Sequence, residues 1–140
     1  MEEVIVHASC VAAHGRGLLI RGASGSGKSS LALAFMALGA RLVADDRTIL
    51  RRRGDRVMAS APVPIRGLIE ARGIGLLNAQ ATEQAALDLV VDLDHTESHR
   101  LPPFRHTRLL EQELPLLYRV ENIHFASMLM QYLKEGRQET

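Results

Sequence analysis

Residues 22–29 have types and a spacing suited to holding phosphate. The segment is GASGSGKS and fits G-x-x-x-x-G-K-[ST] at every fixed position. Its glycines let successive backbone N–H groups turn toward one anion. In this pattern Lys28 reaches the β- and γ-phosphates, and the hydroxyl of Ser29 coordinates Mg²⁺. The predicted phosphate-binding residues are Gly22, Ala23, Ser24, Gly25, Ser26, Gly27, Lys28 and Ser29.

The segments on either side of this loop meet the structural requirement of the pattern. Residues 17–22, GLLIRG, form a short apolar run that predicts a buried strand. From Lys28 the apolar residues favour a helix, and Gly39 stands where a helix-terminating glycine belongs. The positive end of such a helix favours a bound anion. A nucleotide triphosphate, or another polyphosphate, is therefore predicted at the loop, but the loop does not say where the phosphate goes.

Two adjacent carboxylates, Asp45 and Asp46, follow the apolar run RLVA, which predicts a third strand. In phosphate-loop proteins an aspartate at a strand end helps to hold the metal ion. Because neighbouring strand residues point to opposite faces, one carboxylate can face the γ-phosphate while the other serves metal-bound water or backbone. A solvated turn is the alternative interpretation, since aspartates are common there.

Two more side chains are candidates with a plain structural alternative. His7 lies on a first strand predicted over Val4–Ala13, where a histidine is more often structural than catalytic. Glu70 lies in the apolar stretch GLIEARGIGLL, where an unpaired charge costs free energy. It is either a metal ligand or a residue on the exposed face of an edge strand.

The rest of the chain predicts mainly strands. A hairpin turns at Gly54-Asp55, and a strong strand covers 86–94. Residues 95–106 are polar and predict a surface loop that can close over the nucleotide. After one or two further strands, a closing helix has Asn122 as its N-cap, with one face formed by Ile123, Ala126, Met130 and Leu133.

Composition narrows the protein class. The 140 residues predict one domain over residues 1–140, and a net charge of +1 points to neither nucleic acid nor membrane as a partner. The apolar runs are too short for a membrane span, and no signal peptide is predicted. The single cysteine, Cys10, favours a reducing compartment, so we expect a cytoplasmic protein.

Four segments together resemble one family: His7, the loop GASGSGKS, RLVADDR at 41–47 and GLIEARGIGLL at 67–77. The chain is similar to the catalytic domain of HPr kinase/phosphorylase, in a short form without the N-terminal domain of longer relatives. The resemblance is best over residues 4–78. It implies an α/β phosphate-loop kinase domain of the HPr kinase C-terminal type, mostly β-sheet, with a helix after the loop and a C-terminal helix.

The resemblance also implies an activity. Members use ATP and Mg²⁺ to phosphorylate a serine of the phosphocarrier protein HPr. Many also remove that phosphate by attack of inorganic phosphate, which releases pyrophosphate. Long-form members assemble as hexamers, so a homo-oligomer is expected.

Site residues follow position by position from the resemblance. Asp46, in preference to Asp45, takes the serine proton and returns it in the reverse reaction, and His7 orients or tunes Asp46. Arg100 matches an arginine of a mobile loop. The implied metal ligands are Ser29, Asp45 and Glu70, and Lys28 binds the phosphates.

One segment departs from the family pattern. Before its last helix the family has a basic, glycine-containing segment tied to phosphorolysis, whereas this chain has PLLYRVEN, in which Arg119 is the only base. The loss of positive charge argues against the phosphorylase activity. Two alternatives stay open at this point: a regulatory module that binds ATP without transfer, and a kinase of the same fold that acts on a small metabolite.

Overall fold

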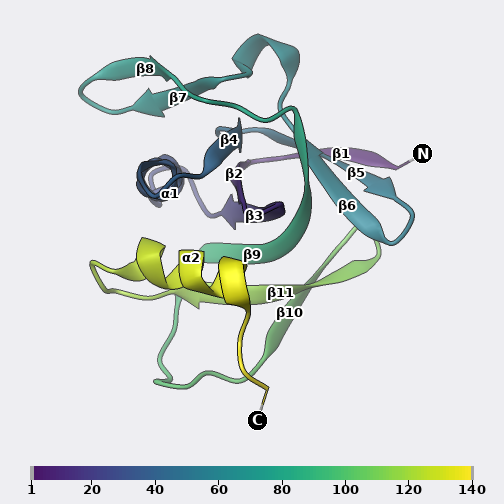
Figure 1. Cartoon of the computed structure of the whole chain (residues 1–140), viewed down its shortest axis with the longest axis vertical. Coiled ribbons are helices and arrows are strands. Elements are labelled where there is room, and N and C mark those ends of the chain that lie inside the picture. Colours follow the sequence, from purple (N-terminus) through teal and green to yellow (C-terminus); the bar gives the residue numbers. More distant parts are fainter. Residues whose placement is uncertain (1, 140) are drawn as a thin grey trace.

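The computed structural model describes residues 2–139, which form eleven β-strands, two α-helices and a short 3-10 helix (Figure 1). The helices are α1 (Lys28–Ala37), α2 (Phe125–Glu135) and η1 (Val63–Ile65). The strands are β1 (Glu3–Val6), β2 (Ala8–Ala13), β3 (Arg16–Arg21), β4 (Arg41–Ala44), β5 (Thr48–Arg53), β6 (Arg56–Ser60), β7 (Leu68–Ala71), β8 (Gly75–Asn78), β9 (Gln84–Thr96), β10 (Arg105–Leu109) and β11 (Gln112–Arg119).

The long strand β9 joins two parts of one sheet. The strands pair in the order β1-β5-β6-β9-β3-β2-β4, and β11 adds to β9 with β10 on its outer side. The start of β9 runs antiparallel to β6, whereas its later residues run parallel to both β3 and β11. The carboxyl ends of β3, β9 and β11 therefore meet at one edge, where binding sites form in parallel sheets. Strands β7 and β8 make a separate hairpin.

Alternating side chains of the central strands supply two hydrophobic cores. Leu18 and Ile20 face the core that is shared with the helices, whereas Leu19 between them faces the core beneath β5 and β6. This alternation is the period-2 pattern of a strand buried on both faces. Figure 1 shows the result, with α1 on one side of β2, β3 and β4 and with β5 and β6 on the other.

Helix α1 and the strand before it confirm the prediction for the segments around the loop. Phe35 is fully buried against the central strands, and Gly39 adopts a left-handed φ of 104° just after the helix ends. Its N–H donates to the carbonyl of Met36, which closes the last turn. The hairpin that turns at Gly54-Asp55 is also confirmed, as β5 and β6.

The prediction of one first strand over residues 4–13 is wrong. The chain forms two strands, β1 and β2, which are interrupted at His7. Strand β1 pairs with β5, whereas β2 pairs with β3 and β4. A continuous apolar run cannot reveal this break, because both halves keep the strand pattern while they join different parts of the sheet.

The start of the closing helix also differs from the prediction. Helix α2 begins at Phe125 with His124 at its N-cap, and the side chain of Asn122 accepts the N–H of His124 in the turn before it. Ile123 lies outside the helix and is 95% exposed, so it is not part of the apolar face. The buried residues of α2 are Leu129 and Leu133, and Ala126 and Met130 pack partly buried beside them.

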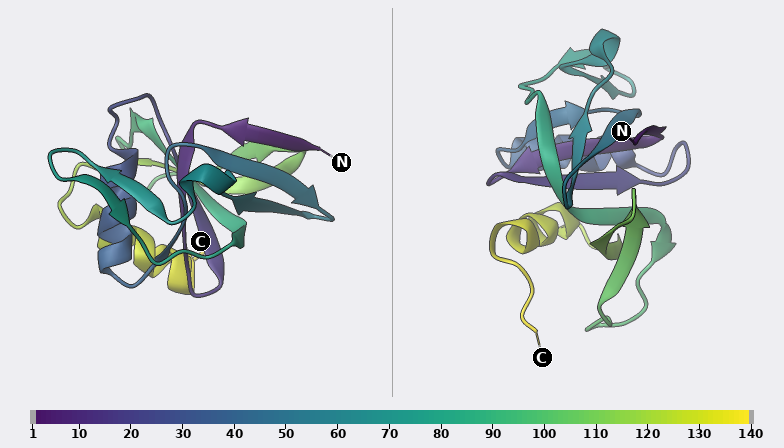
Figure 2. Two further views of the ribbon diagram at one scale, coloured as in Figure 1. Left: turned by 90° about the horizontal axis from the view of Figure 1, so that it is seen from above. Right: turned by 90° about the vertical axis from the view of Figure 1, so that its right-hand side faces the viewer.

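The polar loop after β9 is shorter than predicted, and an ion pair between Glu97 and Arg105 holds its first residue. Strand β9 runs to Thr96 and β10 begins at Arg105, so the loop covers 97–104. The Glu97 carboxylate is 7% exposed and accepts two hydrogen bonds from the guanidinium of Arg105, at 3.1 and 3.0 Å. Figures 1 and 2 show this loop and the β7–β8 hairpin at opposite ends of the molecule.

No helix within residues 2–139 has the length and apolar character needed to span a membrane.

The burial of Phe35 predicts a large contribution to stability. Phe35→Ala should lower the free energy of unfolding by about 3–5 kcal/mol, because it leaves a cavity beneath α1. The half-exposed Leu38 is the control, and Leu38→Ala should cost less than about 1 kcal/mol. Urea unfolding followed by circular dichroism measures both. Equal losses for the two variants would contradict the position of α1 on the core.

The Glu97–Arg105 pair predicts a dependence of stability on pH. Hydrogen bonds from Arg105 lower the pKa of Glu97 from 4.5 to about 2. A lowered folded-state pKa stabilises the fold above the unfolded value and loses that effect as the pH falls toward 2. Glu97→Gln should therefore be less stable than wild type at pH 7, with a difference that narrows between pH 4.5 and 2.

The exposed Glu113 provides the matched control, because Glu113→Gln should change stability little at any pH. Thermal unfolding of the three proteins from pH 7 to 2 gives the comparison. A difference between wild type and Glu97→Gln that stays constant down to pH 2 would show that the carboxylate charge is not what stabilises the loop.

Candidate active site

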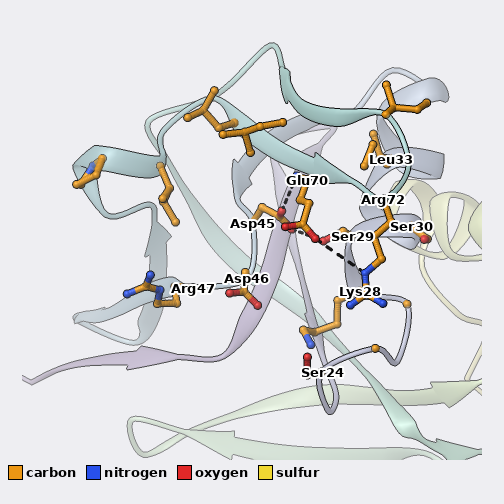
Figure 3. Close-up of a pocket in the computed structure, with 18 residues that line it drawn as sticks. Ser24, Lys28, Ser29, Ser30, Leu33, Asp45, Asp46, Arg47, Glu70 and Arg72 are labelled. Atoms are coloured by element: carbon orange, nitrogen blue, oxygen red, sulfur yellow. Dashed lines mark hydrogen bonds and ion pairs between the residues drawn. The ribbon is translucent and has the colours of Figure 1, made fainter.

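One cavity of about 750 Å³ brings together most of the predicted site residues (Figure 3). It lies between the phosphate loop, the first turn of α1, the end of β4, η1 and the β7–β8 hairpin. The predicted residues that line it are Ser24, Gly25, Gly27, Lys28, Ser29, Asp45, Asp46 and Glu70. His7 does not line the cavity, but it contacts Asp46, which does.

The backbone of the loop leaves the start of α1 open to an anion. Gly25 and Gly27 have left-handed φ angles of 84° and 103°, a conformation that side-chain-bearing residues avoid. No side chain caps α1 and no acidic residue lies in its first turn. The first N–H groups of a helix have no intrahelical acceptor, so an uncapped N-terminus offers them to a ligand. This geometry fits the phosphates of a nucleotide.

Lys28 is folded back over the loop. Its side chain is almost fully buried, and Nζ donates to the carbonyls of Gly22 and Ala23 at 2.9 and 3.1 Å. The two carbonyls hold the ammonium group beside the N-terminus of α1, so the loop combines a full positive charge with the positive end of the helix dipole.

The phosphate loop is held by two side chains, Asp94 and Arg119. The sequence analysis did not identify either of them as a support of the loop. The carboxylate of Asp94 accepts the N–H of Ala23 at 2.9 and 3.1 Å. The guanidinium of Arg119 donates to the carbonyl of Ser26 and, at 3.1 Å, to that of Leu93. Both lie at carboxyl ends of strands parallel to β3, and the topology of the sheet is the signal that could have found them.

Asp45 is the buried carboxylate of the pair and connects three elements. Its Oδ1 accepts hydrogen bonds from the hydroxyls of Ser29 and Ser9, at 2.6 and 2.9 Å. Its Oδ2 accepts the backbone N–H of Glu70 at 3.0 Å. Ser9, which the sequence analysis did not single out, is fully buried and also accepts the N–H of Asp46 at 3.1 Å.

Asp46 points away from Asp45. It adopts a left-handed φ of 68°, and its side chain is 60% exposed at the cavity. Its Oδ1 lies 2.6 Å from Nε2 of His7, which occupies the break between β1 and β2. The two carboxylates thus stand in different environments, one buried beside Ser29 and one open beside a histidine. The break that sequence analysis missed is what places His7 there.

The donors around Ser29 fit a hard divalent cation held jointly with phosphates. The Ser29 hydroxyl and the Asp45 carboxylate are in contact, and the Glu70 carboxylate points into the same cavity, 3.9 Å from Nε of Arg72 (Figure 3). Within residues 2–139, no three His, Cys, Asp or Glu side chains are grouped to hold a metal on their own. Mg²⁺ is commonly held by one or two protein ligands and the substrate's phosphates, so this donor set suits it.

Arg100 is the predicted site residue that does not join the others. It lies in the 97–104 loop and does not line the cavity. The C-terminal segment holds this loop, since Arg137 donates to the carbonyl of Pro102 and stacks over the ring of Phe104. In this structure the loop does not cover the phosphate site.

Comparison with known families shows to which family the chain belongs. The family model of the HPr serine kinase C-terminal domain matches residues 1–117. The chain belongs to this family. The matched residues include the loop, both aspartates and the β7–β8 hairpin, so the family relationship covers the whole cavity.

Curated relatives are longer than this chain. An HPr kinase/phosphorylase from Caldanaerobacter subterraneus subsp. tengcongensis is 37% identical over 106 residues, which are 70% of this chain and 35% of the relative. One from Exiguobacterium sp. is 34% identical over 125 residues, 80% of this chain and 40% of the relative. The chain thus spans about two fifths or less of the length of these relatives.

A solved structure confirms the fold. The HPr(Ser) kinase/phosphatase from Coxiella burnetii superposes with a TM-score of 0.76 over 93% of both chains, at 24% identity. The predicted fold class is therefore correct: an α/β domain of the HPr kinase C-terminal type, mostly sheet, with one helix after the loop and one at the C-terminal end.

The position of Lys28 predicts its effect on nucleotide binding. Lys28→Ala should weaken binding of Mg-ATP about tenfold to a hundredfold, because it removes charge-assisted hydrogen bonds to phosphate. The only other lysine, Lys134, lies near the end of α2 and is the matched control. Isothermal titration calorimetry measures both affinities, with circular dichroism to show that the variants fold. Unchanged affinity in Lys28→Ala would refute the phosphate-loop assignment.

Proposed function

We propose that this chain transfers the γ-phosphate of ATP, with Mg²⁺, to a serine hydroxyl of the phosphocarrier protein HPr. The observation that carries the proposal is that a phosphate loop and an exposed carboxylate, Asp46, line the same cavity. The names of the curated relatives, HPr kinase/phosphorylase, support HPr as the acceptor.

Positioning and charge neutralisation do most of the work in phosphoryl transfer. In the proposed reaction, Lys28 and the N–H groups at the start of α1 bind the phosphates and neutralise the charge that develops on them. Ser29 and Asp45, with Glu70 close by, hold Mg²⁺. An Mg²⁺ held by these residues would supply positive charge to neutralise the charge that develops on the phosphates.

The acceptor side of the reaction depends on Asp46. Its carboxylate takes the proton of the serine hydroxyl as the serine oxygen forms a bond to the γ-phosphorus, and the bond from that phosphorus to ADP breaks. His7, 2.6 Å from Asp46, orients the carboxylate. A base that accepts the proton in this direction returns it in the reverse direction.

The direct experiment is a transfer assay. The protein is incubated with γ-labelled ATP, Mg²⁺ and HPr from the same organism, and the modified residue is mapped by mass spectrometry. Phosphoserine on HPr is the expected result. Binding of ATP without transfer would favour the regulatory module, and transfer to a small acceptor alone would favour a metabolite kinase.

The reverse reaction, homo-oligomeric assembly up to a hexamer and a cytoplasmic location stay predictions. For the reverse reaction, inorganic phosphate is added to serine-phosphorylated HPr and pyrophosphate is measured. Arg119, the base expected to matter here, donates to two backbone carbonyls of residues around the loop. Arg119 is the only basic residue of that segment, and these bonds already use its guanidinium. They therefore support the expectation that the reverse reaction is weak.

The two aspartates should separate binding from transfer. Asp46→Asn should lower the rate of transfer about 10²–10⁴-fold, the usual contribution of a general base, while ATP affinity stays within a factor of about two. Asp45→Asn should instead reduce the gain in ATP affinity that Mg²⁺ provides. Asp55→Asn, in the exposed turn of the β5–β6 hairpin, is the control. If Asp45→Asn stopped transfer while Asp46→Asn did not, the roles of the pair would be reversed.

A further inference from the structure

Ser9 is a fully buried polar residue on β2, and its hydroxyl contacts both aspartates of the pair. The hydroxyl donates to Oδ1 of Asp45 at 2.9 Å and accepts the backbone N–H of Asp46 at 3.1 Å. These two partners use the single proton of the hydroxyl and one of its lone pairs. Within residues 2–139, Ser9 is the one residue whose side chain is hydrogen-bonded to both aspartates.

The pairing of the sheet explains why a side chain is needed at this point. Strand β2 pairs with β4 as far as Cys10 and Ala44, and β4 ends there. The chain then turns at Asp45 and Asp46, so the N–H of Asp46 lies beyond the last backbone pair. An N–H group without an acceptor costs free energy. Ser9, the next residue of β2, supplies the acceptor that the backbone of the sheet no longer offers.

The backbone conformation of Asp46 gives this hydrogen bond a consequence for the proposed reaction. A left-handed φ of 68° is unfavourable for a residue with a side chain and persists only when the surroundings hold it. The hydroxyl of Ser9 holds the N–H of Asp46 in that conformation, while Oδ1 of Asp46 lies 2.6 Å from Nε2 of His7. The position of the proposed base therefore depends on the backbone bond to Ser9.

Asp45 holds the hydroxyl of Ser9 and does not depend on it. Its Oδ1 also accepts the hydroxyl of Ser29 at 2.6 Å, and its Oδ2 accepts the N–H of Glu70 at 3.0 Å. Both bonds remain when Ser9 is replaced, so the Asp45 carboxylate keeps its orientation. Asp46 would keep only its contact with the half-exposed His7. Loss of the Ser9 hydroxyl should therefore disturb Asp46 much more than Asp45.

We propose that Ser9 is a positioning residue of the transfer reaction. Its hydroxyl fixes the backbone of Asp46 against the buried carboxylate of Asp45, and this directs the proposed base toward the acceptor hydroxyl. The inference rests on the proposed function and deepens it. Ser9 is fully buried and does not line the cavity, so its effect on transfer passes through Asp46.

The first test compares Ser9→Thr with Ser9→Val in steady-state transfer to HPr. The two new side chains have nearly the same shape, and only threonine keeps a hydroxyl. Ser9→Val, and Ser9→Ala without added bulk, should lower kcat about tenfold to a hundredfold, because a displaced base is less effective. The KM values for ATP and HPr should stay within about threefold of wild type, as should the kcat of Ser9→Thr. Equal kcat values for the Thr and Val variants would refute the role of the hydroxyl.

Thr48→Val is the matched control for the loss of a buried hydroxyl. Thr48 is fully buried, and its hydroxyl donates to the carbonyl of Ala8, next to Ser9, at 2.8 Å. This variant should lose thermal stability much as Ser9→Val does, but it should keep the wild-type kcat. A fall in kcat of the same size in both variants would show that Ser9 has only a structural role.

The Asp46→Asn background tests whether Ser9 acts through Asp46. In this background Ser9→Ala should lower kcat by no more than about twofold, because the base is already lost. A further tenfold fall would overturn the inference.

Crystal structures without nucleotide supply a readout that does not depend on transfer. In Ser9→Ala we expect Asp46 to leave its left-handed conformation and its carboxylate to move away from His7. In Ser9→Thr both should stay as they are in wild type. An unchanged Asp46 in Ser9→Ala would refute the positioning role.

The outcomes separate the inference from the function on which it rests. Wild-type protein that binds ATP but transfers nothing to HPr would refute both. Transfer by wild type, with the same kcat for Ser9→Ala, would refute the role of Ser9 and leave the kinase activity standing.

Discussion

The parallel alignment of β3, β9 and β11 is the constraint on which the rest of the site depends. It brings three strand ends to one edge, so Asp94 and Arg119 can hold the phosphate loop at Ala23 and Ser26. A glycine-rich loop alone would lose much conformational entropy on binding a ligand. Because these two side chains fix the loop beforehand, its N–H groups stay aimed at one place, and the ligand need not order them.

A second constraint is the buried carboxylate of Asp45. It accepts hydrogen bonds from the start of α1, from β2 and from β7. These bonds connect the helix that follows the phosphate loop to the β7–β8 hairpin on the other side of the cavity. A buried carboxylate with this many donors cannot turn outward without leaving them unsatisfied. Asp46 is the next residue, and its left-handed backbone conformation directs its side chain away from these hydrogen bonds, toward the proposed position of the acceptor. In the proposed reaction, the two adjacent aspartates therefore have different roles: Asp45 helps to hold the metal, and Asp46 takes the proton of the acceptor.

Local patterns in the sequence were enough for the loop, helix α1 and the β5–β6 hairpin, because glycine placement and apolar periodicity are local signals. They were not enough for the break at His7, because a strand that changes partners keeps its pattern. Ile123 was misplaced for a related reason: the turn at Asn122 delays the helix, and an isolated apolar residue can remain exposed. The roles of Ser9, Asp94 and Arg119 depend on which strands are neighbours, and that is a property of the whole fold.

In the proposed reaction, the nucleotide and the acceptor serine enter one cavity from opposite sides of the transferred phosphorus, and the serine lies beside Asp46. The most direct test is a crystal structure with HPr, Mg²⁺ and a non-hydrolysable ATP analogue. We expect the phosphates over the loop and the start of α1, and the acceptor serine oxygen about 3 Å from the carboxylate of Asp46. A serine oxygen far from the carboxylate of Asp46, or phosphates bound outside the loop, would contradict the proposed reaction.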